Sequence, residues 1–187
     1  MDQVVCPKIH PDTKRKMQTG ELNGIGGGQF VPHFLLLRDS RVLPIAEDLW
    51  KKSGGDQDKY TELVFDHITR NIGYAFDEDI EGGLTEYVQM PFEALQRGWG
   101  DCDCSTEAMI SLLSANGVPC HMTFGYAGVG SHRWPEVMYK GVWHVFDTTT
   151  GGVFPIDERI DRGYIDMFYV TPHSFRPSCF PIPLYLP

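Results

Sequence analysis

The sequence predicts a single α+β domain in which one central helix packs on an antiparallel sheet. Residues 98–119 combine a glycine-bounded loop, an apolar helical stripe and an Asn-Gly stop followed by proline, which together indicate one buried helix. Downstream, residues 133–139 and 142–147 are strand-like runs separated by Lys140-Gly141, a pattern typical of a β-hairpin. A chain of 187 residues is long enough for one domain with a real core.

The segments before the central helix alternate between turn-rich stretches and short regular elements. Residues 1–30 are polar and end in consecutive glycines, so we expect an arm or a loop there. Residues 76–85 are acidic but lack the alternating ligand spacing of a calcium loop, which favours a solvated loop. The regular elements expected here are a strand at 31–37, helices at 43–52 and 56–72, and one helical turn at 91–96.

After the central helix the pattern becomes strand-like. Residues 120–127 alternate as a strand does, and residues 166–171 make a last strand after the hairpin. The tail carries several prolines, so we expect it to be extended and to lie outside the core. We therefore expect one domain over residues 1–187, with a core at 56–171, an N-terminal extension at 1–55 and a tail at 172–187.

Charge and cysteine usage restrict the function classes. The net charge of −9 repels phosphate, so we expect no nucleic-acid partner and favour a neutral or cationic one. No apolar run approaches transmembrane length and no signal peptide is visible, so we expect no membrane partner and cytoplasmic synthesis. Five irregularly spaced cysteines do not make a disulfide framework, which favours a reducing compartment.

Cys102 is placed at the start of the central helix. The unpaired N–H groups and the macrodipole at a helix N-terminus favour an anion, so a thiolate is stabilised there. Cysteine is also common as a small buried apolar residue. The Gly-Asp-Cys-Asp segment is polar and glycine-rich, however, so we expect it near the surface and interpret Cys102 as a nucleophile.

The hairpin supplies a possible partner pair for this thiol. If Lys140-Gly141 forms a two-residue turn, Trp134 faces Asp147, and His132 lies two residues from Trp134 on the same face. Diagonal neighbours in a sheet lie about 7–8 Å apart, within side-chain reach. A carboxylate beside an imidazole fixes its tautomer and stabilises its cation. A histidine and an aspartate alone would suit an ordinary surface hairpin, but together with Cys102 they predict a nucleophilic triad.

Three motifs in this order resemble the transglutaminase-like superfamily of papain-type thiol enzymes. They are Gly100-Asp101-Cys102 followed by a helix and Gly117-Val118-Pro119, then His132-Arg133-Trp134-Pro135-Glu136, and then residues 141–149. The resemblance covers residues 56–150 and implies a papain-like, transglutaminase-like core with the nucleophile helix packed on an antiparallel sheet. It implies that Cys102 is the nucleophile, His132 the general base and Asp147 its orienter, with no cofactor.

The resemblance also suggests residues around this triad. The backbone N–H of Cys102 would be one oxyanion donor, and Gln96 and Trp99 compete for the place of the second. Residues expected to border the substrate are Trp134, Gly100 and Asp101.

Cys104 departs from the family pattern, because many relatives carry an acidic residue at this place on the helix. An alternative is a zinc site made from Cys102, Cys104, Cys120 and His121. Cys-x-Cys is an unusual zinc spacing, and a ligated Cys102 could not be a nucleophile. We therefore expect no metal.

The expected reaction is attack of the thiolate on an amide or peptide carbonyl in a peptide, protein or other amide-containing substrate, giving an acyl-enzyme thioester. Water or an amine would then accept the acyl group. We favour hydrolysis, because the small microbial members of the family look more often hydrolytic. The alternative is a structural component of a large assembly such as a viral particle, with partners held by the N- and C-terminal extensions.

Overall fold

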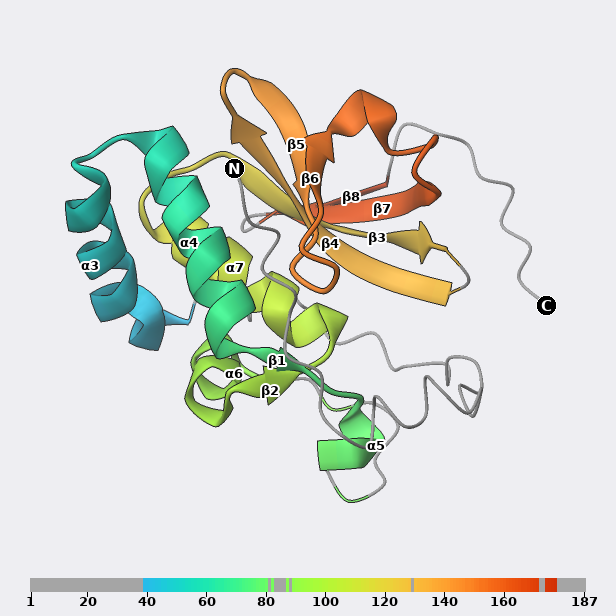
Figure 1. Cartoon of the computed structure of the whole chain (residues 1–187), viewed down its shortest axis with the longest axis horizontal. Helices are drawn as coiled ribbons and strands as arrows, with labels where there is room; N and C mark the ends of the chain where they lie inside the picture. The colour runs from blue at the N-terminus through green and yellow to red at the C-terminus, as the bar shows by residue number, and fades with distance from the viewer. Residues whose placement is uncertain are drawn as a thin grey trace.

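A helical layer packs against one face of a six-stranded antiparallel sheet (Figure 1). The computed structural model describes residues 39–80, 82, 87, 89–128, 130–171 and 174–177. The strand expected at 31–37 and the arm expected at 1–30 lie outside the described residues. The α+β class and the packing of the central helix on the antiparallel sheet agree with the expectation from the sequence.

Local signals explain where the helices begin and end. The Asp56 side chain accepts a hydrogen bond from the Lys59 backbone N–H (2.8 Å) and caps α4. Pro91 occupies the first turn of α6, which ends at Gly98 with a left-handed φ of 74°. None of the described helices is long and apolar enough to span a membrane. The helices are η1 (Ser40–Val42), α3 (Leu43–Ser53), α4 (Gln57–Asn71), α5 (Asp77–Ile80), α6 (Pro91–Arg97), α7 (Cys102–Ala115) and η2 (Ile156–Glu158).

The sheet is built around the predicted hairpin. Lys140 and Gly141 have φ values of 51° and 79°, and Tyr139 pairs directly with Val142, as a two-residue turn requires. The sheet order is β6-β5-β4-β3-β7-β8, and β1 and β2 form a separate parallel pair. The strands are β1 (Gly73–Tyr74), β2 (Trp99–Gly100), β3 (Cys120–Ala127), β4 (Gly130–Tyr139), β5 (Val142–Phe146), β6 (Val153–Pro155), β7 (Tyr164–Thr171) and β8 (Ser174–Pro177).

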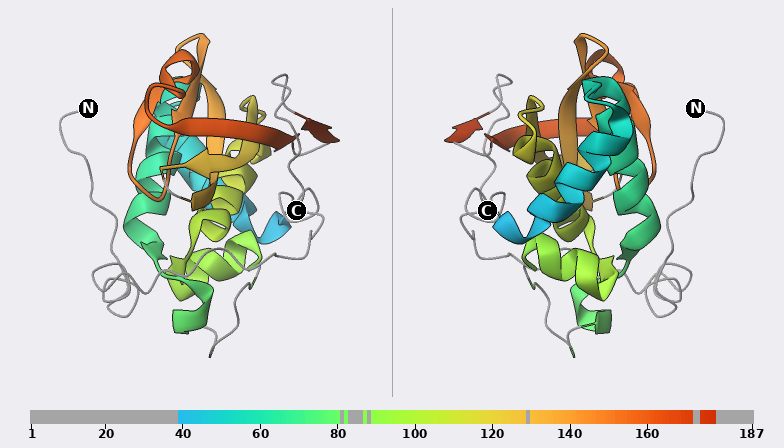
Figure 2. Two further views of the ribbon diagram at one scale, coloured as in Figure 1. Left: turned by 90° about the vertical axis from the view of Figure 1, so that its right-hand side faces the viewer. Right: turned by 90° about the vertical axis from the view of Figure 1, so that its left-hand side faces the viewer.

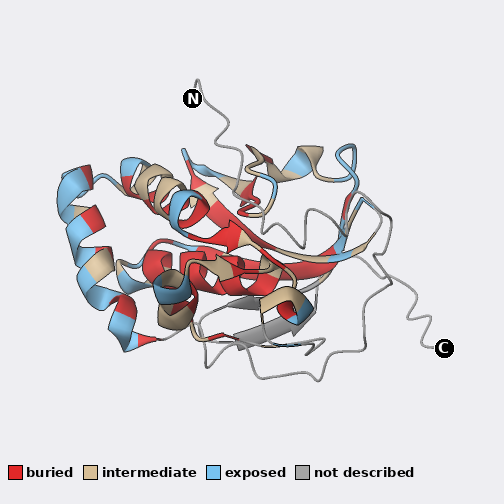
Figure 3. Ribbon diagram, turned by 60° about the horizontal axis from the view of Figure 1, so that its bottom comes forward, coloured by how far each residue is buried: buried red, intermediate tan, exposed pale blue. Residues whose placement is uncertain are grey.

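Helix α7 is the centre of the molecule. It contacts α3, α4 and α6 among the helices and β3 and β4 in the sheet. Figure 2 shows the outer helices and the sheet from two sides, and Figure 3 shows α7 as a buried ribbon between them. Every residue from Asp103 to Leu113 is buried. A helix buried on all sides can hold its first residue at a fixed place relative to the sheet.

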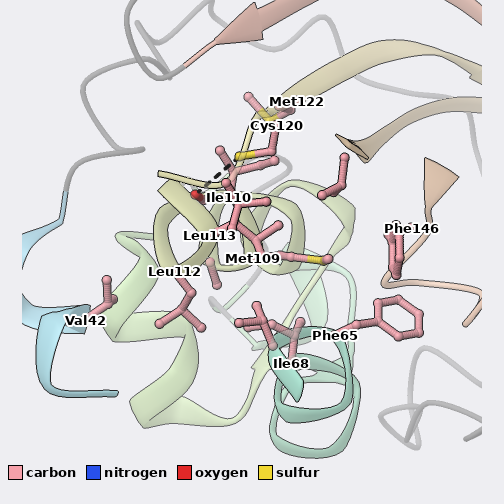
Figure 4. Close-up of a cluster of buried hydrophobic side chains, with 14 of the residues drawn as sticks. Val42, Phe65, Ile68, Met109, Ile110, Leu112, Leu113, Cys120, Met122 and Phe146 are labelled. Atoms are coloured by element: carbon pink, nitrogen blue, oxygen red, sulfur yellow. Dashed lines mark hydrogen bonds between the residues drawn. The ribbon is translucent and has the colours of Figure 1, made fainter. Parts of the chain in front are cut away.

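The core joins one face of the sheet to α7 and the outer helices (Figure 4). Met109, Ile110, Leu112 and Leu113 are all fully buried in it. Val42 and Leu49 belong to the same cluster, so the core begins earlier in the chain than residue 56, where we had placed its start.

Two further expectations differ from the structure. Residues 77–80 of the expected acidic loop form the short helix α5. Residues 174–177 of the expected tail form the edge strand β8, which pairs with β7, so this part of the tail belongs to the sheet. Proline is confined to edge strands and strand ends because it cannot donate to the ladder, and Pro177 stands at the end of the edge strand β8.

Candidate active site

Cys102 is the first residue of α7, as the sequence predicted. The Asp101 side chain caps the helix by accepting hydrogen bonds from the backbone N–H groups of Asp103 (3.1 Å) and Cys104 (3.3 Å). A Cβ atom at Gly100 would lie 2.5 Å from Cβ of Cys104, so only glycine lets the preceding loop pass this close to the helix. Gly100 and Asp101 therefore have structural roles at the start of α7.

His132 and Asp147 form the hydrogen bond that the strand parity predicted. Nε2 of His132 lies 2.9 Å from Oδ2 of Asp147. The other carboxylate oxygen accepts the backbone N–H groups of Thr149 (2.8 Å) and Thr150 (3.1 Å) in the turn that follows β5. The Asp147 side chain is fully buried, so its orientation is set by the backbone on one side and by the imidazole on the other.

The charge of Asp147 is retained despite its burial. Burial by itself would raise the pKa of Asp147, but the hydrogen bond and charge of His132, together with Tyr164 and the Thr150 N–H, lower it below the ordinary value. The side chain of Asp147 is therefore an ionised acceptor. It requires a proton on Nε2 of His132, which leaves Nδ1 as the nitrogen that can accept one.

Two hydrogen bonds join the start of α7 to the residues that follow His132 and Asp147 in the chain. Thr106 Oγ1 donates to the backbone carbonyl of Arg133 (3.2 Å), and the hydroxyls of Ser105 and Thr148 are 2.9 Å apart. Arg133 follows His132 in the chain and Thr148 follows Asp147, so the helix start is held beside both.

Strands β4 and β5 diverge at this point. Their pairing ends at Glu136 and Val145, and β4 continues to Gly130 with β3 alone. The backbone N–H of Arg133, in this open stretch of β4, acts on the sulfur of Cys102. Within the part of the chain that the structure describes, Nδ1 of His132 makes no hydrogen bond. The thiol therefore lies at the open edge of the strand that carries His132.

The electrostatics of Cys102 differ from the expectation for a helix N-terminus. Cys102 is partly exposed, but the desolvation of its sulfur raises the pKa of the thiol well above its usual value, and the charges of Asp101 and Asp103 raise it further. The guanidinium and backbone N–H of Arg133 act in the opposite direction but do not outweigh them. Two acidic neighbours and burial thus act against the helix dipole at Cys102.

This arrangement predicts how alkylation of Cys102 depends on pH. In the wild type His132 can take the proton, so we expect iodoacetamide to label Cys102 at neutral pH. In His132→Ala, labelling requires direct ionisation of the thiol. Because the pKa of the Cys102 thiol is raised, the labelling rate should rise only at alkaline pH, above the pH range in which a free cysteine ionises. Labelling rates measured from pH 6 to 10 would show this, and identical profiles for the two proteins would mean that His132 does not act on Cys102.

The predicted roles of Trp134, Gln96 and Trp99 have different outcomes. Trp134 is fully buried, so our prediction that it borders the substrate is wrong, because a side chain without exposed surface cannot line a binding surface. Gln96 is exposed on α6. A Cβ atom at Gly73 would lie 2.3 Å from the Trp99 ring, so the indole packs across β1. The oxyanion roles of Gln96 and Trp99 stay predictions.

Two tyrosines near the site were missed by sequence reasoning. Tyr164, at the start of β7, donates its hydroxyl to Oδ2 of Asp147 (2.5 Å). Burial raises the pKa of the Tyr74 hydroxyl, and its proximity to Cys102, Asp101, Asp103 and Asp147 adds to this effect. The sequence alone assigned neither residue a role in the site, because β7 and β1 reach the site only through pairing with β3 and β2.

The proposed zinc ligands do not come together. Cys120 lies next to the carbonyl of Ile110 (4.0 Å), far along α7 from Cys102 (Figure 4). His121 pairs with Glu136. Among the described residues, the potential metal ligands that approach one another within 4.8 Å are those of Asp77, Asp101 and Cys104. The zinc alternative is therefore wrong.

Comparison with known proteins places this geometry in context. Residues 45–148 match the family model of the transglutaminase-like superfamily. No curated protein matches the sequence. A candidate cysteine protease from Cytophaga hutchinsonii superposes with a TM-score of 0.50 at 21% identity, over 80% of this chain and 50% of that one. LapG from Legionella pneumophila superposes with a TM-score of 0.50 at 15% identity, over 74% of this chain and 86% of that one.

These structural likenesses show a shared fold, since the sequence identities are low. The chain spans about half of the length of the Cytophaga protein.

Proposed function

Because the chain belongs to the transglutaminase-like superfamily, we propose that it is a thiol enzyme that acts on amide or peptide bonds through Cys102, His132 and Asp147. The observation that carries the proposal is the ionised, buried Asp147 bound to Nε2 of His132, beside the first turn of the helix that Cys102 begins. An imidazole held in this tautomer is a base, and the thiol is the nucleophile that it can activate.

In the first step, Nδ1 of His132 takes the proton of the Cys102 thiol as the sulfur attacks the carbonyl carbon. The new C–S bond turns the carbonyl oxygen into an oxyanion. The backbone N–H of Cys102, in the first turn of α7, has no partner within the helix and can donate to that oxygen. Asp147 stabilises the imidazolium that forms.

In the following steps, the imidazolium gives its proton to the leaving amine as the C–N bond breaks, which leaves a thioester on Cys102. Water then attacks the thioester, with His132 as base, and releases the acid and the free thiol. We propose hydrolysis as the main outcome, and the description of the Cytophaga protein as a candidate cysteine protease supports it. Attack by an amine in place of water would make the same site a transglutaminase.

The charge of the protein favours particular substrates. A net charge of −9 repels acidic peptides, so we propose a neutral or cationic peptide or amide as the substrate. Assembly partners bound by the two ends of the chain stay a proposal, because residues 1–38 and 178–187 lie outside the described part.

The proposed function predicts selective capture of Cys102 by an amide-like electrophile. We expect a neutral peptide that carries an acyloxymethyl ketone to add once, at Cys102, because this is the cysteine that the proposed mechanism activates. Among the other cysteines that the structure describes, Cys104 and Cys120 are buried. Intact-mass measurement followed by peptide mapping checks the site of addition. Cys102→Ala should not react, while Cys120→Ala, at the start of β3, should react as the wild type does. Addition at another cysteine, or undiminished addition to Cys102→Ala, would overturn the proposal.

A further inference from the structure

A buried carboxylate lies behind His132 on the same strand. Glu136 is 4% exposed, and both of its oxygens have partners. One oxygen accepts the indole N–H of Trp134 (3.0 Å), and the other lies 2.8 Å from Nε2 of His121. The mechanism above uses neither Glu136 nor His121.

Trp134 connects this carboxylate to the proposed triad. Its indole stacks on the imidazole of His132, with ring centroids 5.9 Å apart and an angle of 29° between the planes. It also meets the ring of Tyr164 edge-on at 5.2 Å. The hydroxyl of Tyr164 donates to Asp147, so the indole touches both His132 and a partner of Asp147.

The contact with Trp134 fixes the rotation of the His132 ring, which the hydrogen bond to Asp147 does not fix. The hydrogen bond to Asp147 holds Nε2 of His132 in place, but the ring can still rotate about the axis of that bond. A flat indole against one face of the imidazole opposes this rotation and keeps Nδ1 directed to one side.

The indole in turn depends on its surroundings. Gly125 pairs with His132 across β3 and β4. A Cβ atom there would lie 2.0 Å from the backbone oxygen of Ile165 and 2.8 Å from the Trp134 ring, so the glycine makes room for both. The N–H of a fully buried indole needs an acceptor, because an unsatisfied donor costs free energy. Glu136 is that acceptor and thereby selects one orientation of the ring.

We propose that Glu136 is a positioning residue that orients His132 through the indole of Trp134. This inference rests on the proposed function, because it assigns Glu136 to the same site. His121 supports Glu136. The centroid of its ring lies 4.7 Å from that of Trp143 and 4.6 Å from that of Tyr169, and its Nε2 is hydrogen-bonded to the second oxygen of Glu136. The carboxylate is thus held from the side away from Trp134.

The test measures alkylation of Cys102 by iodoacetamide at neutral pH, with the folded fraction checked by circular dichroism. Glu136→Leu removes the acceptor, and we expect labelling to slow on the order of 10-fold, because a small misplacement of a reacting group is costly. Met138→Ala is the matched control on the same strand, two residues further from His132, and it should label as the wild type does.

A double-mutant cycle with His132→Ala separates positioning from general support of the fold. In the His132→Ala background, Glu136→Leu should cause no further slowing, because the residue through which it acts is absent. Equal slowing in both backgrounds would overturn the positioning role. If His132→Ala alone labels like the wild type, the proposed function fails, whatever Glu136 does.

If Glu136→Leu does not fold, Trp134→Phe is the second variant for the same labelling test. It keeps a ring in the core but removes the N–H that Glu136 holds, so we again expect slower labelling. A wild-type rate for folded Trp134→Phe would overturn the inference, because the hold of Glu136 on the indole would then have no effect on His132.

Discussion

Asp147→Asn is expected to slow capture of Cys102 by the peptide electrophile on the order of 10⁴-fold, with the fold retained. One oxygen of Asp147 accepts the N–H groups of Thr149 and Thr150, so the carbonyl oxygen of an asparagine would take that place. The amide NH₂ would then face Nε2 of His132 and the hydroxyl of Tyr164.

This exchange would reverse the tautomer of His132. An NH₂ group donates and cannot accept, so Nε2 of His132 would have to become the acceptor. The ring proton would then sit on Nδ1, the nitrogen that must take the proton from Cys102. The variant would also be unable to stabilise the imidazolium.

The measurement is the second-order rate of capture per folded molecule, beside a thermal melt. Asp161→Asn is the control, because Asp161 is exposed in the loop before β7, and it should leave the rate unchanged. A full rate for folded Asp147→Asn would show that Asp147 only supports the turn after β5, and the site would reduce to Cys102 and His132.

Leu112→Ala is expected to lower the free energy of unfolding by about 2–5 kcal/mol. Leu112 is fully buried in the core on α7, where its removal would leave a cavity (Figure 4). Its carbonyl also accepts the hydroxyl of the buried Tyr60 (2.6 Å), a contact that ties α7 to α4 and that the substitution keeps. The loss should therefore come from packing alone.

Urea unfolding followed by circular dichroism would measure this loss. Leu43→Ala, on α3, should change the free energy of unfolding by less than about 0.5 kcal/mol, because Leu43 is 44% exposed. The capture rate per folded Leu112→Ala molecule should equal that of the wild type, because Leu112 lies away from the reacting atoms. A slower rate per folded molecule would mean that packing at Leu112 also positions Cys102.

The sequence by itself determined the parts of this protein that depend on neighbours along the chain. The apolar spacing within 102–115 and its Asn-Gly stop specify α7, and the Lys140-Gly141 turn specifies the hairpin register. From that register, strand parity was sufficient to predict the contact between His132 and Asp147.

The tertiary structure alone decided the environment of these residues. Whether the Cys102 thiol ionises depends on its burial and on the placement of Asp101, Asp103 and Arg133 around it, and the helix start alone indicated the opposite direction. The prediction that Trp134 borders the substrate was wrong because the exposure of a side chain depends on tertiary packing.

The second layer of the site was likewise invisible in the sequence. Tyr164 reaches Asp147 because β7 pairs with β3, and Glu136 reaches Trp134 and His121 because β3 and β4 share one register. Periodicity and turn chemistry act over a few residues, so they specify elements and their parity. Desolvation, charge and ring contacts act through space, so only the folded chain determines them.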